Sequence, residues 1–294
     1  MSRGLLDMVI AALCFSVMGV LVKFVGQSIP SNEVVFFRSV VGLILSVWMI
    51  RRHGLSPWGV NKPILILRGL LGFSGLLCFF YALTKLPLAD AAVIMSTNPI
   101  WTAILAAVFL RERLSPRVLL ASVAAFIGVT MVARPDFLFG EATSGTGLPL
   151  FAVAIALLGA VSAAGAYVCV RQLRRTDHAL VVILFFPLIA APGSIPTMWD
   201  NAVWPDAGQW LLLIAIGVVV QIAQVFLTRG LHSEPAGRAT AVSYVQVVFA
   251  YLWGLLLFNE VPTPLSIGGA VLIVASAMWV ALERAKRPVV ADAS

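Results

Sequence analysis

Three polar side chains lie inside long apolar runs: the amides of Asn98 and Gln246, in mid-run, and the guanidinium of Arg38. An amide both donates and accepts hydrogen bonds, and a guanidinium can hold a carboxylate through two parallel bonds. An aromatic residue follows each amide three positions later, Trp101 in one run and Phe249 in the other. If the runs are helical, each ring shares a face with its amide. These five residues are therefore candidates for binding a small solute.

Further polar side chains inside the apolar runs could contribute to the same site: Tyr81, Ser162, Gln221, Gln224 and Tyr244. Each candidate also has a structural explanation. Amides and hydroxyls inside a membrane often join helices by hydrogen bonds, and Pro99, next to Asn98, can kink a helix. The Arg38 side chain could reach the outer interface or bind backbone carbonyls. Both kinds of explanation stay open at this point.

The chain lacks the motifs of an enzyme or of an ATP-driven pump, because it has no HExxH, GxSxG or Walker A pattern. Its three cysteines and three histidines are widely separated, so neither a metal site nor a cofactor is expected. No Asp or Glu lies in mid-run. Downhill transport without coupling therefore stays open, as does coupling through a carboxylate near the end of a run, such as Asp7 or Glu33.

The composition is that of a membrane protein. Of the 294 residues, 61% are hydrophobic and only 11% are charged, with a mean hydropathy of +1.00. Soluble domains carry about 25% charged residues. The Lys and Arg residues lie mostly in short segments between apolar runs, which does not favour nucleic-acid binding. Membrane lipids and a small-molecule substrate are the expected partners, and monomeric and homodimeric forms are both compatible with the sequence.

Ten apolar runs are long enough to span a bilayer as helices, which requires about 20 residues each. Alternating strands of about 10 residues, as in a membrane β-barrel, are absent. The fold class is therefore an all-α integral membrane protein. The expected spans are 8–26, 33–50, 63–83, 89–110, 116–133, 150–170, 179–197, 209–229, 239–258 and 265–283.

The chain contains an internal repeat with an offset of 148 positions. The stretch 83–116 aligns without a gap on 231–264, so that Glu112 falls on Glu260 and Pro87 on Pro235. The same offset places Asn98 on Gln246 and Trp101 on Phe249. A fixed period of this kind indicates duplication of a structural unit.

The basic residues predict the orientation of the spans. If the N-terminus is cytoplasmic, fifteen of the 20 Lys and Arg residues fall on the cytoplasmic side. Both termini are then cytoplasmic. Because each half has five spans, the second half enters the membrane from the opposite side. Such inverted repeats are typical of secondary transporters, whose two halves give arrangements open to either side in turn.

The expected organisation follows from the repeat: residues 1–134 and 150–287 form two inverted five-helix repeats, 135–149 an external connector and 288–294 a cytoplasmic tail. Arg38 is the charge placed well inside a span away from the cytoplasmic edge. A phosphate-bearing substrate should require several cations in a cavity, so a single arginine counts against it.

Three stretches resemble the EamA-type ten-span transporters of the drug/metabolite transporter superfamily. NPIWTAILAAVFLRERLSP is similar to that family's fourth-span signature, NEVPTP to the end of its ninth span, and FFRSVVG to its second span. The family often has a proline in the middle of span nine, where this chain has Val247. A matching kink is therefore not expected there.

The resemblance implies a central cavity lined by spans one to four and six to nine, with spans five and ten at the periphery. It also implies export of small metabolites, amino acids among them, across the bacterial inner membrane. Aromatic-amino-acid exporters belong to the same group, and the mid-span aromatic residues would suit such side chains.

The sequence therefore predicts an exporter or uniporter of small metabolites, foremost amino acids, working by alternating access. One alternative is a transporter of a larger, nucleotide-like or lipid-linked metabolite. The other is a membrane enzyme or accessory protein without transport activity, which the missing catalytic motifs disfavour.

Overall fold

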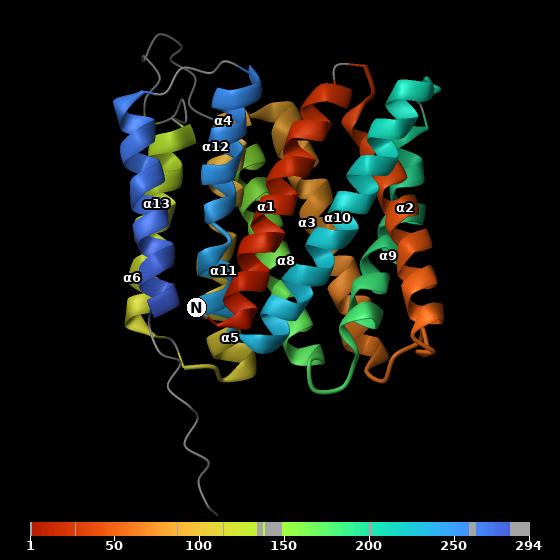
Figure 1. The fold of residues 1–294 in the computed structure, drawn as a ribbon, viewed down its shortest axis with the longest axis horizontal. Coiled ribbons are helices and arrows are strands. Elements are labelled where there is room, and N and C mark those ends of the chain that lie inside the picture. Colours follow the sequence, from red (N-terminus) through yellow and green to blue (C-terminus); the bar gives the residue numbers. More distant parts are fainter. Residues whose placement is uncertain are drawn as a thin grey trace, which may run out of the picture.

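Every regular secondary-structure element of the described residues is a helix. The computed structural model describes residues 2–26, 28–86, 88–113, 115–133, 138, 149–199, 202–258 and 263–282, with the backbone alone at 88 and 89. Ten helical stretches in these ranges are long and apolar enough to cross a membrane (Figure 1). The predicted all-α, ten-span fold is confirmed.

Each half supplies five spans, and the fourth span of each half is broken into two helices (Figure 1). The first half contains α1 (Arg3–Val25), α2 (Ser31–Arg52), α3 (Lys62–Lys85), α4 (Leu88–Met95), α5 (Asn98–Leu110) and α6 (Pro116–Ala133). The second half contains α8 (Leu150–Leu173), α9 (Ala179–Met198), α10 (Ala207–Ser233), α11 (Ala236–Val242), α12 (Val245–Phe258) and α13 (Pro264–Leu282).

The helix ends follow the 148-residue offset. α2 begins at Ser31 and α9 at Ala179, while α4 begins at Leu88 and α11 at Ala236. The predicted duplication is thus a property of the fold and not only of the sequence. Most of the expected connector, the expected tail, Pro87 and Glu260 lie outside the described residues.

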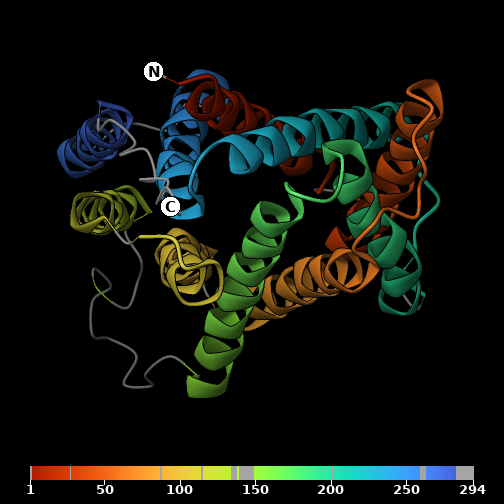
Figure 2. The same ribbon diagram turned by 90° about the horizontal axis from the view of Figure 1, so that it is seen from below.

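Helix packing reveals a pseudo-two-fold axis. α3 packs along α8, and the equivalent pair, α10 and α1, packs in the same way. α2 packs against its own equivalent α9, and α6 against its own equivalent α13. These two pairs lie at opposite ends of the molecule (Figure 2). A helix that contacts its own repeat equivalent must lie beside the axis. The axis therefore runs from one pair to the other and passes between the two helices of each pair.

The broken spans differ from the sequence prediction at one point. The first break falls at Ser96 and Thr97, shortly before Pro99, as the proline predicted. The second falls at Ser243 and Tyr244, although Val247 replaces the expected proline. The expectation that span nine would lack a matching kink is therefore wrong. Ser243 Oγ donates to the Thr240 carbonyl at 2.6 Å, and Tyr244 Oη donates to the Ser96 carbonyl of the other half at 2.8 Å, so side chains hold this break in place of a proline.

The pair α6 and α13 stands apart from the other spans at one end of the bundle (Figures 1 and 2). Their contact depends on glycine: a Cβ at Gly128 would lie 2.7 Å from the Gly269 carbonyl oxygen, and one at Gly269 would lie 2.6 Å from the Gly128 oxygen. Close approach of small residues is a usual way to join membrane helices. The remaining eight spans surround the candidate site.

Candidate functional site

A cavity of about 430 Å³ lies at the centre of the eight-span bundle. Its lining comes from spans one to four and six to nine, with no described residue of α6 or α13, as the family resemblance implied. The volume falls within the usual range for small-molecule sites, about 300–1,000 Å³. Aromatic residues form much of its apolar surface: Phe15, Phe79, Tyr167, Phe186 and Tyr244.

The cavity sits on the pseudo-two-fold axis. Arg38 and Phe186 are 148 positions apart, and the Arg38 guanidinium carbon lies 5.8 Å from the Phe186 ring centroid. Ser96 and Tyr244 are also 148 positions apart and share a 2.8 Å hydrogen bond. Residues at equivalent positions can touch only near the axis that relates them. All four line the cavity, so both halves reach it through the same positions.

Several sequence candidates come together at this cavity: Arg38, Asn98, Gln224, Tyr244 and Gln246. The Asn98 amide oxygen accepts a hydrogen bond from Thr102 Oγ1 at 3.0 Å, which orients the amide. The Gln224 amide oxygen accepts one from Arg68 at 3.1 Å. These bonds occupy acceptors of the two amides and leave their donors available to a ligand.

The other sequence candidates are placed outside the lining of the cavity. Gln221 is buried between α10 and α2, where it donates to Ser46 Oγ at 2.9 Å. Ser162 is buried on α8, and Tyr81 is 37% exposed and packs edge-on against Phe151. Trp101 and Phe249 are half-buried and do not line the cavity, although their amide neighbours do.

Arg68 is the main cavity residue that the sequence did not single out. It lies within the third span, six residues after the start of α3 and near the basic end of that span. In the structure Arg68 is 4% exposed, and its guanidinium carbon lies 5.3 Å from the same Phe186 ring that Arg38 approaches. The expectation of a single cavity cation was therefore wrong. The position of Arg68 inside α3 was the signal that could have identified it as a cavity residue.

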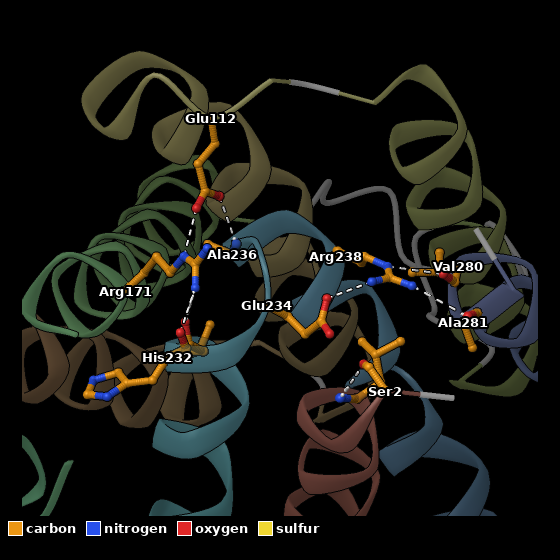
Figure 3. A network of polar contacts seen from close by, with 11 residues as sticks. Ser2, Glu112, Arg171, His232, Glu234, Ala236, Arg238, Val280 and Ala281 are labelled. Carbon is orange, nitrogen blue, oxygen red and sulfur yellow. Dashed lines mark hydrogen bonds and ion pairs between the residues drawn. The ribbon is translucent and has the colours of Figure 1, made fainter. Parts of the chain in front are cut away.

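A charged network joins α5, α8, α10 and α11 at one end of the bundle (Figure 3). Arg171 Nε donates to Glu112 Oε1 at 2.7 Å, and Ala236 N–H donates to Glu112 Oε2 at 2.8 Å. Arg171 Nη1 donates to the carbonyls of Leu231 and His232 at 3.1 and 2.8 Å. Glu112 thus joins the end of α5 to α8 and to the first residue of α11.

Arg238 anchors α11 to the end of α13 and forms a second ion pair, with Glu234 (Figure 3). Arg238 Nη1 donates to Glu234 Oε2 at 2.6 Å, while Arg238 also donates to the Val280 and Ala281 carbonyls at 3.3 and 3.4 Å. Every residue of α11 is buried, and a Cβ at Gly237 would lie 2.8 Å from Ala103 Cβ of α5. This end is therefore tightly packed.

The opposite end lacks this packing. α5 packs against α11, whereas the equivalent pair, α12 and α4, makes far less contact within the described residues. The two halves are thus related by symmetry in their helix pairing but not at the two ends of the cavity. Such a difference between equivalent contacts is what a transporter closed at one end would show.

Neither a metal nor a cofactor site emerges from the described residues. No group of three or more His, Cys, Asp or Glu side chains comes together there, and Cys14, Cys78 and Cys169 are free thiols. The polar groups of the cavity are arginines, amides and hydroxyls, which suit reversible binding of a solute.

Known proteins share both the sequence and the architecture. The EamA-like transporter family matches residues 2–134 and 150–282. The pseudopaline exporter CntI of Pseudomonas aeruginosa is 37% identical over 288 residues, covering 98% of both chains. Human solute carrier family 35 member G1 is 33% identical over 291 residues, covering 96% of this chain and 79% of that protein. A solved crystal structure shares the fold, with a TM-score of 0.81 at 22% identity over 95% of this chain and 96% of the other.

These relatives are transporters and not enzymes, which confirms the expected class. Ten apolar spans, two inverted repeats and a match in each half agree with one another. The chain therefore belongs to the EamA-like transporter family and is a multi-pass membrane transporter.

Proposed function

We propose that this protein is a secondary transporter that exports amino acids or closely related metabolites by alternating access. The observation that carries the proposal is a cavity on the pseudo-two-fold axis that combines arginines, amides and aromatic rings. Arginine suits the α-carboxylate of an amino acid, and the aromatic rings suit an apolar side chain. The name of the pseudopaline exporter supports the outward direction.

In the proposed cycle, the two ends of the cavity take turns in being closely packed. In this structure Glu112 joins the end of α5 to α11 and to Arg171 of α8, while α4 and α12 make far less contact. We assign the joined end to the cytoplasm, because it carries exposed basic residues such as Arg111 and Arg113. The described state then opens away from the cytoplasm, and its pseudo-symmetric counterpart opens toward it.

Counterflow in proteoliposomes tests the proposal. Vesicles preloaded with one unlabelled amino acid are diluted into the radiolabelled compound, over a panel of amino acids, with and without an imposed pH gradient. Saturable flux that ignores the gradient would establish a facilitator. Flux that follows the gradient would indicate coupling through a carboxylate such as Asp7 or Glu33, of which Glu33 is buried and accepts the Val203 N–H at 3.0 Å. Absence of flux for every amino acid would refute the substrate class.

Replacing a cavity amide is expected to weaken transport, while replacing an aromatic residue outside the lining is not. Gln246→Ala removes a group that lines the cavity, and the loss of one hydrogen bond, about 1 kcal/mol, should raise KM roughly fivefold. Trp101→Phe should leave KM within about twofold, because Trp101 does not line the cavity. Initial counterflow rates over a range of substrate concentrations measure both, and an equal effect of the two variants would contradict the placement of the site.

Both termini are expected on the cytoplasmic side of a bacterial inner membrane. A reporter that is active only in the cytoplasm, fused after Ser294, should be active, and one that is active only outside should be silent. Fusion of the same pair of reporters after Leu86, between spans three and four, should give the opposite result. The reverse pattern would invert the assignment of the closed end.

A further inference from the structure

The cavity contains two positive charges and no described negative one. Arg38 projects from α2 and Arg68 from α3, and both line the cavity. No Asp or Glu of the described residues lines it, and neither arginine forms an ion pair with a carboxylate there. Buried charges are normally paired, because an unpaired charge is costly away from water. No described carboxylate therefore competes with an anionic ligand for this pair.

The hydrogen bonds of the two guanidinium groups are also incomplete. Each guanidinium has five N–H donors. Arg68 donates through Nη2 to Gln224, and Arg38 donates through Nη1 only to the Met18 sulfur, at 3.9 Å. The Nε of each arginine is buried without an acceptor among the described groups. The positive charge and several N–H donors of the two arginines are thus available to an anionic ligand.

One aromatic ring brings the two arginines together. Their guanidinium carbons lie 5.8 and 5.3 Å from the Phe186 centroid, so their separation cannot exceed the sum of these distances. Attraction to the ring offsets only a small part of the mutual repulsion of the two charges. The arginines enter from opposite ends of the bundle, because α2 and α3 are consecutive spans and each arginine lies six or seven residues after its helix start.

We propose that the cavity selects a substrate with two separate carboxylates, one held by Arg38 and the other by Arg68, with an apolar part against Phe186. This inference rests on the proposed function and narrows its substrate class. Two forked donors on different helices fit two planar carboxylates better than one tetrahedral phosphate. An amino acid with a neutral side chain would engage only one arginine and leave the other charge unbalanced.

Matched ligands test this preference by binding alone. The purified full-length protein in detergent is titrated with 4-carboxy-L-phenylalanine and with 4-carbamoyl-L-phenylalanine, which has the same shape without the second charge. O-phospho-L-tyrosine serves as the phosphate arm. Intrinsic tryptophan fluorescence reports affinity, since the chain has eight tryptophans. The dicarboxylate is expected to bind at least about tenfold more tightly than the carbamoyl compound, as expected for a charge-assisted pair.

Substitutions of the two arginines test whether they cause the preference for the dicarboxylate. Arg68→Gln and Arg38→Gln should each reduce the tenfold ratio to within about twofold, while Arg68→Lys should keep part of it. Arg117→Gln is the matched control, because Arg117 is exposed at the start of α6, and it should leave the ratio unchanged. The thermal midpoint without ligand shows that each variant is folded. A merely structural role for Arg68 would change this midpoint but not the ratio.

The outcomes separate this inference from the proposed function. Equal affinity for the two phenylalanine derivatives, no binding of either, or a preference for the phosphate arm would each overturn the inference. A ratio that survives in Arg68→Gln would overturn the assignment to Arg68. Dicarboxylate binding without counterflow would refute transport and keep the site, whereas equal counterflow of both derivatives would keep transport and refute the inference.

Discussion

Glu112→Gln is expected to open the closed end of the cavity. A glutamine presents one oxygen and one NH₂ group, so it can no longer accept from both Arg171 and the Ala236 N–H. Loss of a charge-assisted bond of this kind costs roughly 1–3 kcal/mol. Because the bonds exist only when α5, α8 and α11 are together, the cost falls on this conformation alone. The population open at this end should rise about tenfold or more.

Thiol labelling measures the shift. Ser243, which lines the cavity beside the break between α11 and α12, is replaced by cysteine in a background without Cys14, Cys78 and Cys169. An impermeant maleimide is applied from the side on which α5 ends. Glu112→Gln should increase the labelling rate about tenfold, and Arg113→Gln, an exposed neighbour, should not. An unchanged rate in Glu112→Gln would show that the network does not hold this end closed.

Gly237→Leu is expected to stop the transport cycle by preventing closure at the same end. A Cβ at Gly237 would lie 2.8 Å from Ala103 Cβ and 3.1 Å from Ala103 Cα, so a backbone must move to admit the larger side chain. Overpacking of this kind costs about 1–3 kcal/mol or more, and α11 is buried on all sides. The closed form should be lost, and counterflow should fall at least about tenfold.

Gly19→Leu is the matched control, because nothing beyond the neighbouring backbone of its own helix lies within 4 Å of a Cβ placed there. It should transport like the unmodified protein. Labelling of Ser243→Cys from the α5 side should rise in Gly237→Leu, which separates a protein trapped open from one that fails to fold. Normal counterflow in Gly237→Leu would show that contact between α5 and α11 is not part of the cycle.

Glu112→Gln and Gly237→Leu test the same end of the cavity through different interactions. Glu112 acts through hydrogen bonds and charge, whereas Gly237 acts through the space between two backbones. If both variants open this end, the seal depends on packing and on the network together. The repeat offset places Lys23 at the position equivalent to Arg171, and Lys23 lies 3.8 Å from the centroid of the Phe258 ring at the end of α12. The opposite end of the bundle therefore also has a basic residue beside the end of its broken span.

The sequence alone determined the architecture of this protein. Span number, helical fold and inverted duplication follow from run length, basic residues and a constant offset, which are properties of the chain read along its length. Asn98 and Gln246 were found in the same way, because an amide in an apolar run is uncommon and the repeat marks it twice. Both amides line the cavity.

Only the tertiary structure decided which neighbours of these amides share the cavity. Trp101 and Phe249 lie three positions further along their helices, about 60° around the axis, and this rotation takes them out of the lining. The break at Ser243 and Tyr244 also depends on a partner in the other half, the Ser96 carbonyl. Helical spacing predicts neighbours on one helix but not the direction in which a packed helix faces.

The charge of the cavity was the property that depended most strongly on the tertiary structure. By position, Arg68 belongs to the basic end of its span and Arg38 to the opposite half of the membrane. Consecutive antiparallel helices and a single ring on α9 bring the two guanidinium groups into one cavity. The pairing of charges depends on distance in space, which the order of residues does not contain.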